Sequence, residues 1–409
     1  MGFENGRCQN VERKIIITKE MNAVWTYLLE NEQIAEIHCS PDESEDSNHF
    51  ALGNIYIGKV TNIVTNIGAA FINIGGINCY YDLSQAASAF FTHKSGKKEL
   101  CIGDELLVQI SKEAVKTKAP TVSSNISLTG RFAVLTSGNT RIGASGKIPK
   151  ALREELKEQL QIFKNEEYGI IVRTNAKDAE FSEVLKEIQM LTVKYEQLKR
   201  NALYRTCFSC LYTADKSYLS DLKNVYSEGL KEIVVEDQDL YEEILEYMNR
   251  EQPDYIEKVR LHNDKMLPLS KLYSTESIRE RALSERVWLK HGGYLIIQPT
   301  EALTVVDVNS GKDVSKKKDQ HTYLKINIEA AEEIARQIRL RNYSGIILVD
   351  FINLDDDELM AILLKEFRRF LSKDPIQTTL VDVTQLQLVE VTRKKTRRPL
   401  HEYAAYYNK

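Results

Sequence analysis

The 409-residue sequence has no apolar run long enough to span a membrane, since a transmembrane helix needs about 20 consecutive apolar residues. Its first residues are polar and show no secretory apolar core. These two absences predict a cytoplasmic protein. An excess of one charge is also lacking, because the formal net charge is −4. This excludes a protein that holds a polyanion through its overall field, so any nucleic acid must be bound by local basic clusters.

Cysteine is scarce, with six scattered residues, which in a cytoplasmic chain are expected to be reduced thiols. Cys207 and Cys210 have the spacing of half a zinc site, but no second pair completes it, so we interpret them as two cysteines near a helix end. Basic residues form three clusters, each of which by itself is more typical of a solvated face. These clusters are Lys112, Lys116 and Lys118; Lys316, Lys317 and Lys318; and residues 393–398.

What the sequence does contain is a pair of apolar strands that each end in an aspartate. Residues 303–312 run from a strand into a polar turn, with Asp307 where the strand gives out, and residues 345–351 carry Asp350 at their far end. Residues 325–341 between them have helical periodicity, so the order strand, helix, strand predicts a parallel crossover. Adjacent strands lie about 4.8 Å apart, which would bring both carboxylates together at the ligand-binding edge of the sheet.

Two close carboxylates are unfavourable unless a cation or a proton lies between them. Mg²⁺ suits this position, because it is content with one or two carboxylates, waters and substrate phosphate. Asn309 and Lys312 in the turn beside Asp307 favour a functional site. The alternative is that Asp307 and Asp350 each cap only a strand end or a helix.

Residues 50–119 predict a small barrel, because several short strands recur at regular spacing with glycine turns. Such barrels bind single-stranded nucleic acid through exposed aromatic side chains on a strand face. Phe71 and Tyr81 are the candidates, with core packing as the alternative for Phe71. Residues 169–174 predict a strand that ends in Arg173 and Thr174, a pair suited to a terminal phosphate. An arginine at a strand end is by itself more typical of a structural role, which is the alternative.

The remaining chain alternates between helix and strand. Residues 11–40 predict a strand, a short helix or turn and a second strand, and the helix–strand material of residues 217–265 looks like the missing half of the same domain. The barrel and the mixed region after it would then be an insertion. Residues 278–289 and 357–371 predict helices in a last domain.

The motifs in this order resemble the catalytic half of the ribonuclease E/ribonuclease G endoribonucleases, from about residue 11 to residue 400. The most specific stretches are residues 301–311 (Glu-Ala-Leu-Thr-Val-Val-Asp-Val-Asn-Ser-Gly), 327–342 and 389–397, together with residues 54–60 and 69–71, which resemble the family's S1 barrel. The resemblance implies a multidomain α+β and α/β protein, in which a ribonuclease H-like domain is split by an S1 (OB-fold) barrel and a 5′-sensor region and is followed by a deoxyribonuclease I-like catalytic domain. The expected parts are a ribonuclease H-like first part (11–48), the S1 barrel (49–122), the 5′-sensor region (123–216), a ribonuclease H-like second part (217–277), the catalytic domain (278–400) and a tail (401–409).

The resemblance also implies roles for individual residues. These are Asp307 and Asp350 as Mg²⁺ ligands, Asn309 as support for the metal-binding aspartate, Phe71, Tyr81, Lys112 and Lys118 as RNA-binding residues, and Gly130, Val134, Arg173 and Thr174 as the sensor of a 5′-monophosphate. The implied activity is Mg²⁺-dependent hydrolysis of single-stranded RNA that leaves a 5′-phosphate and a 3′-hydroxyl, in ribosomal RNA processing, messenger RNA decay or both, with stimulation by a 5′-monophosphate. A non-catalytic S1-type RNA-binding protein and a metal phosphodiesterase acting on DNA are the alternatives.

Three departures from the family pattern change the expectations. Gln385 stands where a basic residue is usual near the sensor, which predicts weaker phosphate sensing. Asp82 follows Tyr81 where an apolar residue is usual, which predicts an altered RNA face of the barrel. The sequence has no Cys-Pro-x-Cys motif after Arg398, so the family's zinc link between subunits is not expected. Any homodimer would then form without zinc, and a tetramer is not expected.

Overall fold

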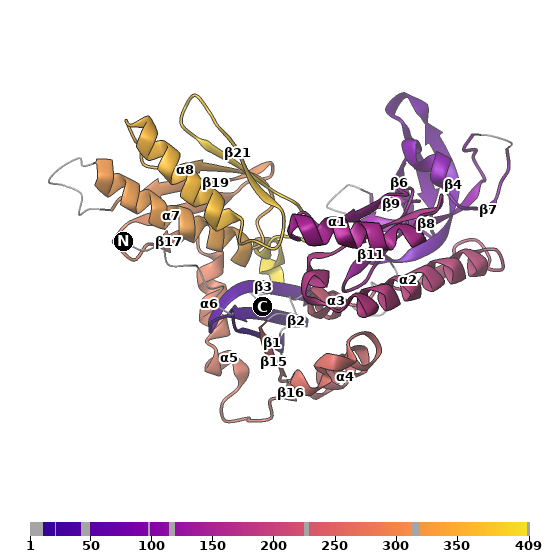
Figure 1. Ribbon diagram of the computed structural model, residues 1–409, viewed down its shortest axis with the longest axis horizontal. Helices are drawn as coiled ribbons and strands as arrows, with labels where there is room; N and C mark the ends of the chain where they lie inside the picture. Colours follow the sequence, from indigo (N-terminus) through magenta and orange to yellow (C-terminus); the bar gives the residue numbers. More distant parts are fainter. Residues whose placement is uncertain are drawn as a thin grey trace. The chain divides into compact units, whose positions relative to one another are not determined.

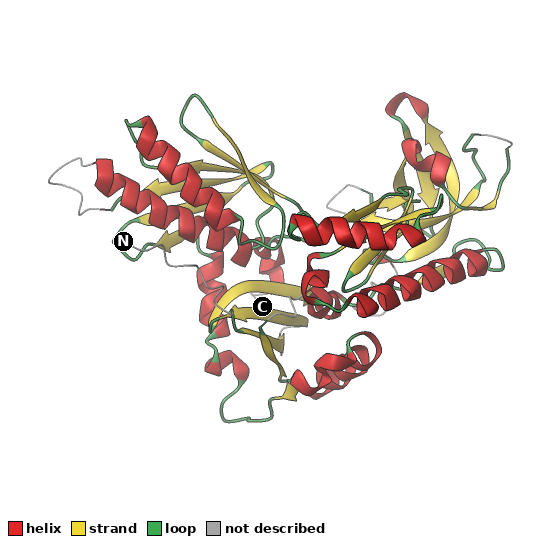
Figure 2. Ribbon diagram, viewed as in Figure 1, coloured by secondary structure: helices red, strands yellow, loops and turns green. Residues whose placement is uncertain are grey.

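The computed structural model describes residues 11–20, 22–41, 50–96, 99–113, 119–224, 229–311 and 320–406. The chain forms two compact units (Figure 1): the first combines the chain up to residue 42 with the chain from residue 228 onward, and the second is residues 43–227. Helices and strands are mixed in both units (Figure 2), as the sequence predicts. None of the helices in the described ranges is both long and apolar enough to cross a membrane.

The first unit contains a five-stranded sheet made from both of its chain segments. Its strands are, in order, β16 (Val259–Leu261), β15 (Leu230–Val235), β1 (Arg13–Glu20), β2 (Ala23–Glu30) and β3 (Gln33–Pro41). The associated helices are α4 (Gln238–Glu251), α5 (Leu269–Leu272) and α6 (Thr275–Leu283), with a 3-10 helix at Pro253–Lys258.

Strand β2 lies where the sequence predicts a short helix or turn, so that prediction is wrong. The seven residues from Ala23 to Leu29 are all buried, which removes the alternation of apolar and polar residues by which a strand is recognised. Asn22, with φ of 58°, makes the tight turn from β1 into β2.

The second sheet of this unit has six strands and carries the two aspartates. Its order is β17 (Arg286–Trp288), β18 (Tyr294–Pro299), β19 (Leu303–Asn309), β20 (Gly345–Asp350), β22 (Val389–Arg393) and β21 (Thr378–Val383). Helix α7 (Gln320–Leu340) connects β19 to the parallel strand β20, which confirms the predicted crossover. Residues 286–288 form a strand rather than the end of the predicted helix, since α6 ends at Leu283.

Helices α7 and α8 (Asp357–Leu371) pack side by side against one face of the six-stranded sheet (Figure 2). Their apolar residues and the inward residues of the strands form one buried core. Side chains of a strand alternate between faces, so the other face of the sheet presents Val305 and Asp307 of β19, which are exposed. The buried face thus holds the sheet together, and the opposite face carries the exposed side chains of the strands.

Arg339 joins the two sheets of the first unit through α7. Its guanidinium donates to both carboxylate oxygens of Glu30 at 2.8 and 3.1 Å and to Glu36 at 2.7 Å. Burial raises the pKa of both glutamates, but hydrogen bonds and charges from Arg339, from Arg13 on Glu30 and from His38 on Glu36 outweigh it. The pKa of each carboxyl is therefore lowered, and both are ionised partners of Arg339.

The second unit contains a closed barrel. Strands β4 (Ile55–Val64), β5 (Ala69–Asn73), β6 (Asn78–Asp82), β9 (Thr121–Ser123) and β8 (Glu105–Lys112) pair in this order, and β8 pairs back with β4. This is the strand order 1-2-3-5-4-1 of a five-stranded Greek-key barrel of the OB type. β7 (Phe91–His93) and β14 (Cys210–Tyr212) extend the sheet at its ends, and 3-10 helices lie at Thr65–Ile67 and Leu83–Ser88.

A four-stranded sheet completes this unit. It has the order β10 (Ser127–Thr129), β11 (Ala133–Ser137), β13 (Tyr168–Val172) and β12 (Ile142–Ala144). Helices α1 (Lys150–Gln159) and α2 (Phe181–Ala202) contribute to its core, and α3 (Ser217–Asn224) and 3-10 helices at Leu160–Phe163 and Thr174–Asp178 complete the connections. The mixed α and β fold with an OB-like barrel is thus confirmed, while the ribonuclease H-like and deoxyribonuclease I-like assignments and the domain boundaries stay predictions.

Candidate active site

Asp307, two residues before the end of β19, and Asp350, at the end of β20, lie on neighbouring parallel strands in the same register. They are direct Cα partners between β19 and β20, and both are exposed. Adjacent strands lie about 4.8 Å apart, so the two carboxylates leave the same face of the sheet side by side. Asn309 lies two residues beyond Asp307 on that face and donates its amide N–H to Asp307 Oδ2 at 2.8 Å. The three residues expected at the centre are therefore brought together.

The electrostatics of the pair fit a hard cation. Partial burial, and then the negative charge of Asp307, raise the pKa of Asp350. Both causes disfavour the ionised form of Asp350, and a cation such as Mg²⁺ between the two carboxylates would offset them. All the side-chain ligands offered are oxygens, and the described residues contain no cluster of three or more His, Cys, Asp and Glu residues that could hold a metal. The donor set therefore suits a metal that keeps several of its waters.

Two glycine turns pack against each other beside these carboxylates. Gly311, with φ of 72°, follows β19, and a Cβ on it would lie 2.2 Å from the carbonyl oxygen of Gly292. A Cβ on Gly293 would in turn lie 2.8 Å from the carbonyl oxygen of Asn309. Only glycine fits at such close backbone approaches. The turn after β19, which begins beside Asn309, and the Gly-Gly pair before β18 together fix the position of Asn309.

Helix α7 positions the segment that follows Asp350 through two buried or partly buried amides. Asn327 donates to the carbonyl of Ile352 at 2.7 Å and accepts from its N–H at 3.0 Å. Gln320 makes the same two-way contact with Asp355, at 2.9 Å to the carboxylate and 3.1 Å from the N–H. Sequence reasoning missed both amides, because helical periodicity identifies apolar faces and not contacts to a distant loop.

The barrel aligns two of its candidate RNA-binding side chains, Phe71 and Lys112, in one row with Tyr80. Phe71 is the Cα partner of Tyr80, Tyr80 of Thr121, and Thr121 of Lys112, across β5, β6, β9 and β8. Phe71 and Tyr80 are half-buried and Lys112 is exposed. Two aromatic rings and a cation thus share the outer surface, which is the arrangement that binds single strands.

Tyr81 does not belong to this row, and its predicted role conflicts with its position. Its ring is fully buried in the barrel core, and its hydroxyl lies 2.8 Å from that of Ser124. The side chains of β6 alternate, so the outward neighbour is Tyr80, which sequence reasoning missed. Asp82, on the same side as Tyr80, is exposed and caps the following 3-10 helix through the N–H of Ser84.

The four predicted sensor residues lie around one loop of the second unit. Arg173 Nη1 donates to the carbonyl of Gly130 at 2.6 Å, and the hydroxyls of Thr174 and Ser145 are 2.9 Å apart. Val134 belongs to β11, whose pairing with β13 brings the loop beside Arg173. The structure therefore groups these side chains, while their role in sensing phosphate stays a prediction.

Glu187 of α2 holds the same loop and was not singled out by the sequence. Its carboxylate accepts the backbone N–H groups of Arg131, Phe132 and Ala133 at 2.9, 2.8 and 2.9 Å. A Cβ on Gly130 would lie 2.1 Å from Glu187 Oε1, so a larger residue there would displace this carboxylate. Successive N–H groups that converge on an anion fix the loop conformation.

The structure describes only part of the three basic clusters, and one described arginine is structural. Arg393 is 2% exposed and donates to Asp374 at 2.7 Å and to Asn342 at 2.7 Å, so this part of the 393–398 cluster is structural. Lys118 lies outside the described residues, as do Lys116, Lys312 and Lys316–Lys318. Gln385 lies in the turn between β21 and β22 and is exposed.

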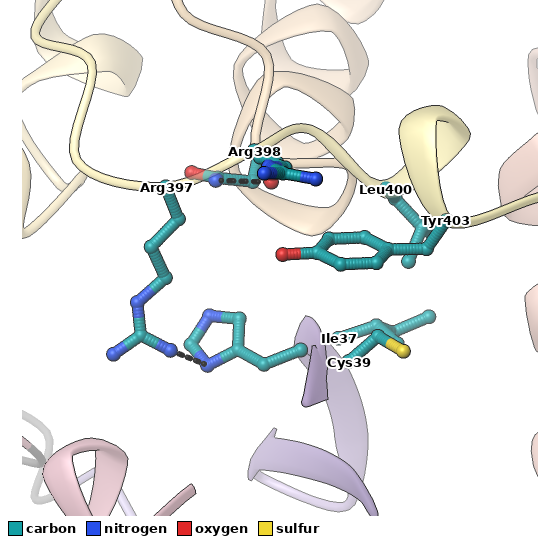
Figure 3. A pocket seen from close by; sticks show the side chains of 8 residues that line it. Ile37, Cys39, Arg397, Arg398, Leu400 and Tyr403 are labelled. Carbon is teal, nitrogen blue, oxygen red and sulfur yellow. Dashed lines mark hydrogen bonds between the residues drawn. The ribbon is translucent and has the colours of Figure 1, made fainter. Parts of the chain in front are cut away.

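A small pocket of the first unit lies between β3 and the segment that follows β22 (Figure 3). Arg397 points toward the imidazole of His38, with 3.3 Å between Nη1 and Nδ1, and the Tyr403 ring closes another side. Neither Asp307 nor Asp350 lines it. This pocket is therefore separate from the carboxylate pair.

Comparison with known proteins identifies the relatives of the chain. The model of the "Ribonuclease E/G family" matches residues 127–396. The chain is similar to ribonuclease E of Synechocystis sp., with 35% identity over 86% of this chain and 53% of the relative, and thus spans about half of that protein's length. It is also similar to ribonuclease G of Haemophilus influenzae, with 31% identity over 91% of this chain and 77% of the relative, and to ribonuclease G of Escherichia coli strain K12, with 31% identity over 90% and 76%. The match of the family model and the coverage of these relatives show that the chain belongs to the ribonuclease E/G family.

Proposed function

We propose that this protein is an endoribonuclease that hydrolyses single-stranded RNA in the cytoplasm. The observation that carries the proposal is the register of Asp307 and Asp350, which puts two exposed carboxylates side by side with Asn309 bonded to one of them. Names of the relatives, ribonuclease E and ribonuclease G, support the same reaction class. The substrates are ribosomal RNA precursors, messenger RNA or both.

Asp307 and Asp350 hold Mg²⁺ in this proposal, and Asn309 fixes the orientation of Asp307. Mg²⁺ supplies an activated water and neutralises charge at the scissile phosphate. Attack of water on phosphorus in line with the leaving 3′-oxygen breaks the P–O3′ bond. The products are a 3′-hydroxyl on one fragment and a 5′-phosphate on the other.

The second unit binds the RNA strand. Phe71 and Tyr80 stack on unpaired bases, and Lys112 contacts a phosphate from the same row. Single-stranded RNA suits these residues because its bases are not already stacked in a duplex. Arg173 and Thr174, with the loop between Gly130 and Val134, bind a 5′-monophosphate and thereby stimulate cleavage.

The decisive experiment is cleavage of a labelled single-stranded RNA in Mg²⁺ or in EDTA. We expect internal cuts with Mg²⁺ alone, and Asp307→Asn should abolish them while leaving RNA affinity largely intact. Asp382→Asn, an exposed aspartate of the same sheet, is the matched control and should cut normally. Full activity of Asp307→Asn would refute the metal assignment, and binding without any cuts by the wild type would favour a non-catalytic RNA-binding protein. A DNA strand of the same sequence tests the sugar.

Phosphate sensing is tested with RNAs that differ only at the 5′ end, one with a monophosphate and one with a hydroxyl. We expect faster cleavage of the monophosphate form, and Arg173→Lys should reduce the difference because a lysine cannot bind two phosphate oxygens with one planar group. Equal rates for the wild type would show that Arg173 and Thr174 are not a working sensor.

A further inference from the structure

An aromatic pair, with its tryptophan exposed and its tyrosine half-buried, lies on the same sheet as the carboxylates. Trp288 of β17 and Tyr294 of β18 are direct Cα partners, and their ring centroids are 5.4 Å apart at an interplanar angle of 58°. The Trp288 side chain is 66% exposed. Tryptophan is highly buried on average, so a solvent-exposed indole on the surface of a sheet is unusual and indicates a binding surface.

The strand register ties this pair to the catalytic candidates. Tyr294 is the Cα partner of Asn309, so Trp288, Tyr294 and Asn309 form one row across β17, β18 and β19. The next row on the same face is Arg286, Ile296, Asp307 and Asp350. Two strand spacings, or about 10 Å, separate the Cα atoms of Arg286 and Asp307. The aromatic pair lies in the row next to that of the two aspartates, on the same face of the sheet.

A cation completes the cluster. The Arg286 guanidinium lies 4.6 Å from the ring centroid of Tyr294 and 5.5 Å from that of Trp288. Arg286 is exposed and forms no salt bridge with a carboxylate of the described residues. The guanidinium charge can therefore contact a phosphate, while its planar group and the two aromatic rings can stack on a base.

The connection between the two strands holds the pair rigidly. In the turn from β17 to β18, the N–H of Lys290 and Nδ1 of His291 both bond Glu329 of α7, at 2.5 and 2.7 Å. Gly293 packs against Asn309 in the same turn. Movement of the aromatic pair relative to Asn309 is therefore restricted, as a substrate-positioning site requires.

We propose that Trp288, Tyr294 and Arg286 form a subsite that stacks the base of a nucleotide next to the scissile phosphate of single-stranded RNA. The proposal rests on the proposed function, because it takes Asp307 and Asp350 as the site of cleavage. The subsite positions the strand at the reacting phosphate and adds a preference for a stackable base there. Stacking of this kind changes affinity by about 5- to 150-fold per base.

Intrinsic fluorescence provides a test that needs no cleavage. The chain has two tryptophans, and Trp25 is 1% exposed, so a change on adding RNA reports mainly on Trp288. We expect the tryptophan fluorescence of the Asp307→Asn variant to be quenched when single-stranded oligoribonucleotide is added. The double variant Asp307→Asn, Trp288→Phe should show no such quenching. An unquenched Trp288 at saturating RNA would overturn the proposal. Failure of the wild type to cut RNA refutes the proposed function instead, while quenching would still support a base-binding subsite.

Cleavage kinetics test where the base lies. Trp288→Ala should lower kcat/KM by roughly tenfold or more, Trp288→Phe should retain most of the activity, and Tyr204→Ala, which removes an 84% exposed aromatic of the other unit, should have no effect. In RNAs with one abasic residue moved stepwise past the cleavage position, the penalty of Trp288→Ala should vanish at a single position. An equal penalty at every position would overturn the proposal. It would also be overturned if, in sedimentation without RNA, the wild type were a dimer and Trp288→Ala were not, because a second copy of the chain would then cover this face.

Discussion

Replacing Gly311 by alanine should separate the folding of the six-stranded sheet from the placement of the turn that holds Asn309. The residue has φ of 72°, a region that costs an L-residue about 1–2 kcal/mol. An added Cβ would also lie 2.2 Å from the carbonyl oxygen of Gly292. Ordinary van der Waals contact begins near 3.4 Å, so one of the two turns must move by more than about 1 Å. Asn309 is part of the displaced turn, and a misplacement of about 1 Å in an active site can cost on the order of 100-fold in rate.

Gly345→Ala is the matched control, because Gly345 has φ of 83° in the same sheet but an added Cβ there would meet nothing within 4 Å. Gly345→Ala should lose about 1–2 kcal/mol of unfolding free energy in urea, and Gly311→Ala at least as much because of its added backbone clash. Only Gly311→Ala should lose about 100-fold in kcat/KM for RNA cleavage. The reasoning is refuted if Gly311→Ala cuts RNA as fast as Gly345→Ala.

Two further substitutions test the fold and the RNA surface. Arg339→Met should lower the free energy of unfolding by about 3 kcal/mol at pH 7, because it leaves two partly buried carboxylates without their main cation. Arg336→Met on the exposed side of the same helix should cost at most about 0.5 kcal/mol. Folding lowers the pKa of both glutamate partners, so their contribution to stability is present above the unfolded pKa of about 4.3 and is lost as the pH falls through the lowered folded values. In urea unfolding, the loss of stability caused by Arg339→Met should therefore be smaller at pH 3 than at pH 7. Equal losses at the two pH values would contradict the assignment. Tyr80→Ala should weaken binding of a labelled single-stranded RNA by about tenfold, measured by fluorescence anisotropy, while Tyr81→Phe should leave binding unchanged and cost about 1 kcal/mol of stability through its lost hydrogen bond. The reverse order of RNA affinities would contradict the inward orientation of Tyr81.

The crossover around the two aspartates could be predicted from sequence because its strands and helix have separate signals. The strands are short apolar runs that end in polar turns, and the helix between them has a long 3.6-residue period. Strand β2 lacks such a signal, since both of its faces are buried. Strand β17 is three residues long and follows a helix directly, so its pattern merged with that of α6.

The assignment of faces in the barrel failed for a different reason. Tyr80 and Tyr81 are adjacent residues of the same type, and a shift of one residue moves a side chain to the opposite face of a strand. Composition cannot choose between them, whereas the hydrogen-bond register can, because it pairs Tyr80 with Phe71. The contacts of Glu187 with the loop before β11 join residues more than 50 positions apart and leave no local pattern to detect.

Cross-strand rows, rather than sequence motifs, account for both surfaces to which function is assigned. The barrel row places Tyr80 beside Phe71, and the catalytic sheet places Tyr294 beside Asn309. In each case an aromatic residue that sequence reasoning had not singled out stands next to a residue that it had identified. A row depends on register, so a substitution that slips β18 against β19 by one residue would turn Tyr294 into the core and disconnect it from Asn309. The glycine turns at the end of these two strands oppose such a slip, because the close backbone approaches of Gly293 and Gly311 are satisfied in only one register.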